Sequence, residues 1–170
     1  MNDLNFMKQA YIVGARDGTD PSTQNGCVLV DCFDKIVAIG ANHFPNCVAD
    51  NYTVKERWDR PLKYSYVEHA ERNAIYNAAR SGIKTRGLTM YCYWAACADC
   101  ARAIIQSGIK RLVTHKPIMD ISHERWKDTI EIAFGMMREA GIQLDQVEEP
   151  INDIQIRFNG KLWAPNYEQS

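Results

Sequence analysis

Two short clusters of residues have the types and the spacing of a catalytic metal site. His69 and Glu71 are separated by one residue, and Cys97 and Cys100, further along the chain, are separated by two. Catalytic zinc commonly takes three protein ligands and leaves a fourth position to water, and His69, Cys97 and Cys100 form such a set. Glu71 is too close to His69 for both to bind one compact site, so we expect it to carry a proton beside the metal. The pattern predicts hydrolytic chemistry at a zinc ion.

Each cluster alone also has a simpler interpretation. A Cys-x-x-Cys pair occurs as a redox pair or as half of a structural zinc site, and an isolated His-x-Glu indicates little. Together they are more specific, because each is expected at the start of a helix, where free N–H groups and the helix dipole favour thiolate over thiol. The alternative is a non-catalytic scaffold or regulatory subunit stabilised by zinc. Glu71 argues against it, since a structural site needs no proton carrier.

The composition limits the class of protein. With 170 residues, of which 46% are hydrophobic and 24% charged, one globular domain is expected. Lys and Arg number 20 against 21 acidic residues, so no overall basic field indicates a nucleic-acid partner. The sequence shows no signal-peptide pattern and no apolar run of about 18 residues, as a membrane span would need. We therefore expect a cytoplasmic protein with reduced cysteines, no membrane and no nucleic-acid partner.

The elements that must position the two clusters alternate along the chain. Helical spacing predicts a helix over residues 3–16, and two β-rich runs around Phe33-Asp34 predict a hairpin. An irregular stretch, 41–65, follows; its aromatic content favours an ordered loop. After it we expect helices and strands in turn, over 69–80, 88–92, 98–106, 111–114, 124–140 and from 142 onward. This order predicts a three-layer α/β/α sandwich with a mixed central sheet.

Further cysteines and histidines have less specific patterns. Cys27, Cys32 and Cys92 lie in expected strands, and we expect them to be buried as small apolar residues. His115 and His123 have no partners at ligand spacing, so surface or helix-capping roles are favoured.

Two further groups of residues lie near the clusters in sequence. Arg57, Arg60 and Lys63 form a basic cluster; most such clusters are solvated, but a nucleotide phosphate would need groups of this kind. The helix over 124–140 carries an apolar stripe that we expect to belong to the core. The stripe is Trp126, Ile130, Phe134 and Met137.

The spacing His-x-Glu…Pro-Cys-x-x-Cys is typical of zinc-dependent nucleobase deaminases, and the chain meets it except that Ala96 replaces the proline. Residues 6–142 resemble the deoxycytidylate (dCMP) deaminases of the zinc-dependent cytidine deaminase superfamily. Four blocks carry the resemblance, and the last two are specific. They are Asp20-Pro21-Ser22-Thr23-Gln24-Asn25-Gly26, residues 39–45, residues 63–75 and residues 97–110.

The resemblance implies hydrolytic conversion of dCMP to dUMP with release of ammonia, supplying dUMP for thymidylate synthesis. It assigns zinc, with no other cofactor, to the His69, Cys97 and Cys100 set and proton transfer to Glu71. It also implies that Asn42 and the Ala70 backbone N–H contact the substrate, with Thr23 as a further candidate. Members of the family commonly form homo-oligomers, so we expect a hexamer or a dimer.

The chain departs from the family pattern around the expected pocket. Tyr93-Trp94-Ala95 replaces a smaller, more polar lead-in to the metal-binding cysteines. Gly40-Ala41-Asn42-His43 stands where many members have Gly-Tyr-Asn-Gly, a motif associated with activation by dCTP, so the usual dCTP/dTTP regulation is not expected. Alternative substrates are a 5-substituted dCMP, another cytosine nucleotide or nucleoside, or a pterin-like base. RNA or DNA editing is less favoured because of the charge balance.

The last part of the chain lies outside the resemblance. Two β-rich runs flank Asn159-Gly160, a dipeptide typical of a two-residue hairpin turn. We expect residues 1–150 to form the zinc-dependent deaminase domain and residues 151–170 to form a C-terminal β-hairpin tail packed on that domain. The sequence assigns the tail no role.

Overall fold

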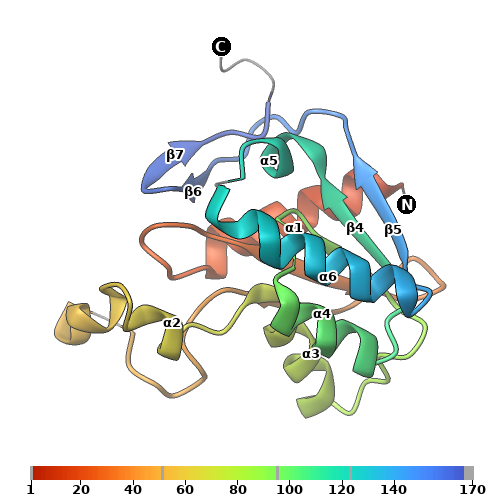
Figure 1. Ribbon diagram of the computed structural model, residues 1–170, viewed down its shortest axis with the longest axis horizontal. Coiled ribbons are helices and arrows are strands. Elements are labelled where there is room, and N and C mark those ends of the chain that lie inside the picture. The colour runs from red at the N-terminus through yellow and green to blue at the C-terminus, as the bar shows by residue number, and fades with distance from the viewer. Residues whose placement is uncertain (1, 51, 95, 123, 167–170) are drawn as a thin grey trace.

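The computed structural model describes residues 2–50, 52–94, 96–122 and 124–166 (Figure 1). Within these residues, five strands form one sheet in the order β2-β1-β3-β4-β5, and two more form a separate hairpin. The strands are β1 Gly26–Val30, β2 Ile36–Ala41, β3 Thr89–Cys92, β4 Arg111–His115, β5 Gln143–Val147, β6 Ile156–Phe158 and β7 Lys161–Trp163. The α-helices are α1 Asp3–Asp17, α2 Lys63–Tyr66, α3 Ala70–Arg80, α4 Ala98–Gln106, α5 Lys116–Asp120 and α6 Lys127–Glu139.

The sheet is mixed. β1 runs antiparallel to both β2 and β3, whereas β3, β4 and β5 run parallel to one another. Parallel neighbours need a crossover connection, which α4 supplies between β3 and β4 and which α5 and α6 supply between β4 and β5. None of the described helices is long and apolar enough to cross a membrane.

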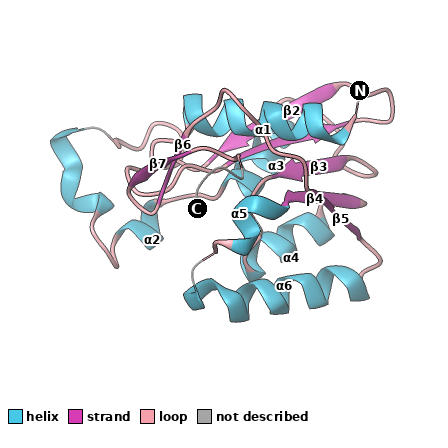
Figure 2. Cartoon of the chain, turned by 90° about the horizontal axis from the view of Figure 1, so that it is seen from above, coloured by secondary structure: helices cyan, strands magenta, loops and turns pink. Residues whose placement is uncertain are grey.

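Helices cover both faces of the sheet because side chains along a strand alternate between the faces. Cys27 and Leu29 of β1 pack with α3, α4 and α6 in one buried cluster. Val28 and Val30 of the same strand pack on the other face with α1, α5 and β6. α4 and α6 lie side by side in both views (Figures 1 and 2). The predicted three-layer α/β/α sandwich is confirmed.

The packing of α3 on β2 places the first metal-site cluster. Asn73 and Asn77, one turn apart on α3, donate side-chain hydrogen bonds to the carbonyl oxygens of Ala41 (2.8 Å) and Ile39 (2.9 Å). Gly40 lies between these two carbonyls, and a Cβ there would lie 2.3 Å from the backbone nitrogen of Ala74. Only glycine allows this approach, so β2 fixes the start of α3.

The expected loop over residues 41–65 contains regular structure that its sequence does not predict. A 3₁₀-helix spans Tyr52–Trp58, and α2 follows it. Phe44 stacks on Trp58 with ring centroids 4.2 Å apart and packs against Tyr66 at 5.3 Å. For the described residues of this stretch, the expectation of an ordered loop is confirmed, and the aromatic contacts account for the order.

Two expectations for single residues are wrong. Cys32 is exposed, because β1 ends at Val30 and a tight turn begins at Asp31. The side chain of Asp31 accepts the N–H of Lys35 at 3.0 Å and so stabilises this turn. His115 is fully buried, with Nδ1 2.8 Å from the Tyr11 hydroxyl. Cys27 and Cys92 are buried as expected. His123 lies outside the described residues.

Candidate active site

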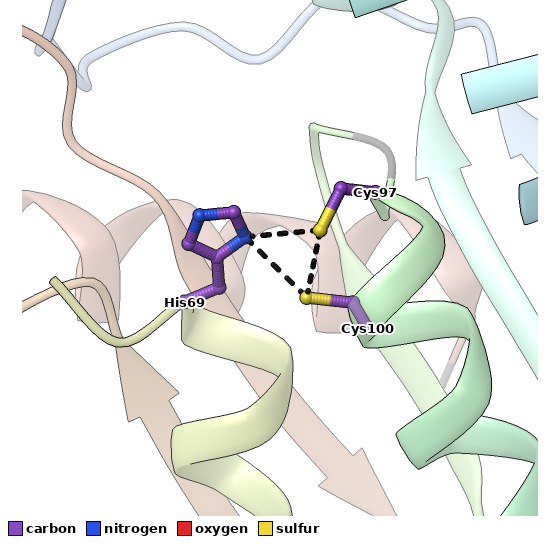
Figure 3. A group of neighbouring side chains, drawn as sticks. All are labelled: His69, Cys97 and Cys100. Atoms are coloured by element: carbon purple, nitrogen blue, oxygen red, sulfur yellow. Dashed lines mark hydrogen bonds between the residues drawn. The ribbon is translucent and has the colours of Figure 1, made fainter. Parts of the chain in front are cut away.

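His69, Cys97 and Cys100 converge at the starts of two neighbouring helices (Figure 3). Nδ1 of His69 lies 3.5 Å from Sγ of Cys97 and 3.4 Å from Sγ of Cys100, and the two sulfurs are 3.7 Å apart. Tetrahedral zinc with ordinary bond lengths would hold two sulfurs about 3.8 Å apart and a sulfur and a nitrogen about 3.6 Å apart. The three donor atoms therefore fit a zinc ion.

The backbone explains why these side chains meet. His69 is the N-cap of α3 and Cys97 is the N-cap of α4. Neither side chain caps its own helix, so both are directed to the space between the helices. The first turn of α4 receives a substitute acceptor from α6, because the N–H of Ala98 donates to Oγ1 of Thr129 at 3.1 Å.

The surroundings of the cluster favour negative charge on the sulfur of Cys97, whereas the hydrogen bond with Cys97 and burial raise the pKa of Cys100. The hydrogen bond between the two cysteines lowers the pKa of Cys97 to about 3. Nη1 of Arg72 donates to Sγ of Cys100 at 3.5 Å, and the Arg72 side chain is held by Glu68, four residues before it. Glu68 also accepts the backbone N–H of His69 at 3.0 Å. A bound zinc ion would require both thiols to be deprotonated, and the nearby guanidinium of Arg72 would reduce the cost of holding two thiolates.

Glu71 is buried beside the three candidate metal ligands. Glu71 is only 1% exposed, and its Oε2 atom has no hydrogen-bond partner among the described residues. Burial raises the pKa of Glu71. A buried oxygen without a partner is costly, so such an atom in a native site indicates a role with a water or a ligand. The orphaned oxygen supports the fit to a metal site that holds water.

A cleft of about 750 Å³, part of it open to solvent, leads to the cluster. His69, Glu71 and Cys97 lie in its lining. Polar and aromatic residues from several elements complete the wall: Thr23, Asn25, Asn42, Tyr64, Trp94 and Trp126.

The structure places the expected substrate residues at this cleft or next to it. Asn42 and Thr23 line it. Oδ1 of Asn42 accepts the N–H of Asn25 at 2.6 Å, and its Nδ2 donates to the carbonyl of Thr23 at 2.7 Å. Nδ2 carries a second hydrogen that can face a ligand. Ala70 is buried and opens α3, so its N–H belongs to the first turn, whose N–H groups have no acceptor within the helix.

Part of the expected core stripe belongs to the cleft instead. Met137 is buried in the core and Phe134 packs against it, but Trp126 and Ile130 line the cleft. Trp126 stands edge-on to Trp94, with ring centroids 6.0 Å apart. Helical spacing marks an apolar face but does not say whether protein or ligand covers it, so these two residues were missed. The signal that could have found them is their position at the start of the helix.

A buried ion pair also lines the cleft. Lys63 and Asp20 are 6% and 4% exposed, and Nζ of Lys63 lies 2.8 Å from Oδ2 of Asp20. Asp20 also accepts the N–H of Ser22 at 2.8 Å, which holds the start of the loop over residues 20–25. The solvated role favoured for Lys63 as part of a basic cluster is therefore wrong, and Asp20 is a cleft residue that its sequence position alone did not indicate.

Comparisons with known proteins agree with this site. Residues 1–116 match the family described as the cytidine and deoxycytidylate deaminase zinc-binding region. The deoxycytidylate deaminase of Pongo abelii is 40% identical over 113 residues, covering 64% of this chain and 61% of that protein. An uncharacterized deaminase of Aliivibrio fischeri is 33% identical over 139 residues, covering 82% of this chain and 88% of that protein.

The fold has solved counterparts. The dCMP deaminase of cyanophage S-TIM5, in complex with dCMP and dUMP, superposes with a TM-score of 0.61 at 21% identity and covers 86% of this chain and 99% of that one. This likeness shows a shared fold.

The mixed sheet and the His-Cys-Cys cluster at two helix starts define a zinc-binding deaminase domain. The chain belongs to the cytidine and deoxycytidylate deaminase family. It spans 61% of the length of the curated relative from Pongo abelii that it matches. The family expected from the sequence is confirmed, and so is zinc as its metal.

Proposed function

We propose that this protein hydrolyses dCMP to dUMP and ammonia. The observation that carries the proposal is the buried Glu71, whose Oε2 has no partner among the described residues and which stands beside the three metal ligands. A structural zinc site has no use for such a carboxylate. The deoxycytidylate deaminases among the relatives, and the dCMP and dUMP bound in the cyanophage protein, support the choice of substrate.

The chemistry assigned to this chain is proton transfer by one carboxylate. A bound zinc ion would supply Lewis acidity and lower the pKa of the water that it holds. Glu71 takes a proton from the water that attacks C4 of the cytosine and delivers it to ring N3. It then passes the second proton of that water to the amino group, so that the C4–N bond breaks and ammonia leaves. The raised pKa of Glu71 suits a group that must both accept and donate.

The cleft walls are proposed to hold the nucleotide. The rings of Trp94 and Trp126 form an apolar part of the cleft wall, and the base is proposed to lie against it. Asn42 and the N–H of Ala70 are proposed to contact its polar edge. Arg60 is exposed at the cleft and forms no ion pair with a carboxylate among the described residues, whereas the ammonium of Lys63 is held by Asp20. Arg60 is therefore the proposed partner of the 5′-phosphate.

Ammonia release across a substrate panel tests the proposed function. The panel contains dCMP, dCTP, deoxycytidine and 5-methyl-dCMP, each measured with zinc-loaded protein and repeated with dCTP or dTTP added. We expect dCMP to give the highest kcat/KM and the added nucleotides to have little effect. A preference for the methylated nucleotide would favour the alternative of a 5-substituted substrate. Release from none of the four compounds would overturn the proposal.

The variant Arg60→Gln tests the phosphate assignment. Loss of one charged hydrogen-bond partner should raise KM for dCMP about tenfold. The same variant should leave deoxycytidine, which has no phosphate, unaffected. Equal changes for both substrates would show that Arg60 acts on the cleft as a whole.

The expected homo-oligomer, a dimer or a hexamer, also remains a proposal. β2 and β5 form the two edges of the main sheet, and large apolar side chains such as Ile132 and Tyr76 are 58% and 48% exposed. Exposed apolar side chains contribute to an interface between subunits when they lie in one continuous patch. Sedimentation velocity of the zinc-loaded protein would give the state directly, and a monomer at micromolar concentration would contradict the proposal.

A further inference from the structure

The hairpin β6–β7 is joined to the loop over residues 20–25, which forms one wall of the cleft. This loop carries the cleft residues Asp20, Thr23 and Asn25. Four hydrogen bonds connect the two segments. They run from the N–H of Gln24 to Arg157 O (2.9 Å), from the N–H of Gly160 to Ser22 O (2.8 Å), from the N–H of Arg157 to Gln24 Oε1 (2.8 Å) and from the N–H of Asn159 to Thr23 Oγ1 (3.3 Å).

Gln24, within the loop over residues 20–25, connects this loop by hydrogen bonds to the hairpin and to the end of α1. Its Oε1 accepts from the backbone of Arg157, while its Nε2 donates to the carbonyls of Ala15 (3.2 Å) and Gly18 (3.0 Å). Its own carbonyl accepts the hydroxyl of Tyr93 at 3.0 Å. Gln24 is 6% exposed and does not belong to the cleft lining, so its contacts serve to hold the loop.

The hairpin also supports the aromatic wall. Phe158 of β6 is 6% exposed and stands edge-on to Trp94, with ring centroids 5.4 Å apart and an interplanar angle of 83°. The indole nitrogen of Trp94 donates to Oγ of Ser122 at 2.5 Å, which fixes the other end of the ring. The ring of Trp94 is therefore held by its contact with Phe158 of the hairpin and by its hydrogen bond to Ser122.

We infer that the hairpin β6–β7 is a positioning element for the nucleotide: it orders the loop of Thr23 and Asn25 and the ring of Trp94. None of its described residues lines the cleft, and it lies beyond the residues that match the family. A hairpin with strands this short is marginally stable alone, so its order depends on these contacts. A wall that is ordered before binding reduces the conformational entropy lost when the ligand binds. The identity of the nucleotide rests on the proposed function.

Two variants that leave the cleft lining unchanged test the inference. Gln24→Leu removes the side-chain hydrogen bonds that connect the loop to the hairpin and to α1. Phe158→Leu removes the ring that packs edge-on against Trp94 while keeping an apolar side chain. We expect each variant to raise KM for dCMP about tenfold. The cleft wall must then become ordered when the nucleotide binds, and the conformational entropy lost in that step weakens binding. We expect kcat to change by less than about threefold and zinc content to stay at one ion per chain, because the metal ligands and Glu71 lie at the starts of α3 and α4.

Arg157→Ala is the matched control. Its side chain is exposed, and the two bonds to Gln24 come from its backbone, so KM should not change. Unchanged KM in both test variants would overturn the inference. A parallel fall of kcat and zinc content would also overturn it, since the hairpin would then serve only general stability.

A second readout separates this inference from the proposed function. If the zinc-loaded wild type releases no ammonia from any nucleotide, the proposed function fails. The inference is then tested by hydrogen exchange at the backbone amide of Asn25, which donates to Oδ1 of Asn42 within the cleft wall. Exchange at this amide should be faster in Gln24→Leu than in wild type and in Arg157→Ala. Equal exchange in all three proteins would overturn the inference.

Discussion

At the scale of single residues, Glu71 offers the sharpest test of the chemistry. Replacing it by glutamine keeps the size of the side chain and removes the proton carrier. We expect ammonia release from dCMP to fall by about 10²–10⁴-fold, the usual contribution of a general acid–base group. Zinc content should be unchanged, because Glu71 is not one of the three ligands.

Glu131→Gln, on the exposed side of α6, is the control for this loss. It changes the same functional group far from the metal ligands in sequence and should leave kcat unaltered. Activity of Glu71→Gln equal to that of wild type would sink the proton-transfer assignment. Loss of zinc together with activity would show that Glu71 acts on the site's structure.

His115 predicts a pH dependence of stability. The carbonyl of Glu149, 3.0 Å from Nε2, can only accept, so Nε2 carries the proton and Nδ1 accepts from the Tyr11 hydroxyl. Burial lowers the pKa of His115 below its ordinary value of 6.5. As the pH falls through this ordinary value, the unfolded chain takes up a proton that the folded chain does not. The contribution of neutral His115 to stability is therefore complete above the unfolded pKa and is lost below it.

The measurement is the free energy of unfolding between about pH 7.5 and 5.5 for wild type and His115→Gln. Wild type should lose more stability over this interval than the variant, which cannot take up the proton. All other titrating groups are common to the two proteins, so the difference isolates His115. Two parallel curves would contradict the assignment.

The sequence indicated the residues of the candidate metal cluster more readily than those of the cleft that surrounds it. His69, Cys97 and Cys100 could be selected because metal ligands need particular atoms at particular spacing, and the structure brings their donor atoms together. Trp126 and Ile130 could not be separated from the core, because apolar residues serve both purposes. His115 was misplaced because its partner, Tyr11, is 104 residues away and no local pattern indicates the contact.

At the scale of elements, the contact of α3 with β2 has a specific prediction. Gly40→Ala would place a Cβ 2.3 Å from the backbone nitrogen of Ala74 and 2.4 Å from the carbonyl oxygen of Ala70. Because backbone rather than a flexible side chain is in the way, α3 must move. Overpacking of this kind typically costs about 1–3 kcal/mol. The shift should also reduce zinc affinity, since His69 and Glu71 lie at the end of α3 nearest this contact.

Gly135→Ala is the matched control within a helix. A Cβ at Gly135, in α6, meets no atom within 4 Å. Alanine has the higher helix propensity, so this change should stabilise the protein by up to about 1 kcal/mol. Chemical denaturation and zinc titration of both variants give the comparison. Equal stability of the two would show that β2 does not fix α3.

The elements that were predicted correctly are those whose structure is indicated by the local spacing of apolar residues or by the residues of a turn. α1, α3 and α4 have apolar faces at helical spacing, and the turn at Asn159-Gly160 has the residues that a tight hairpin requires. The 3₁₀-helix Tyr52–Trp58 could not be predicted, because its order comes from the stacking of Trp58 on Phe44. Tertiary contacts decide such segments.

At the scale of the whole molecule, a zinc ion held by His69, Cys97 and Cys100 would join the starts of two helices that belong to separate crossover units. A ligand that binds only the folded state stabilises it, by about 2.7 kcal/mol when its concentration is 100 times Kd. We therefore expect a chelator to lower the thermal midpoint of the wild type. Cys100→Ser should begin with a lower midpoint and respond little to the chelator. A wild-type midpoint that does not respond to complete zinc removal would contradict the assigned site.

The contacts of the hairpin also imply an order in which the site is assembled. The metal ligands are separated by at most 31 residues in the chain, whereas the bonds from the hairpin to Gln24 and Thr23 join residues 133 and 136 apart. Shorter loops close at a smaller entropic cost and form sooner. During synthesis, the metal ligands emerge from the ribosome well before β6. The nascent chain can thus acquire zinc before the hairpin has ordered the loop over residues 20–25 and Trp94, so metal loading and substrate recognition mature as separate events.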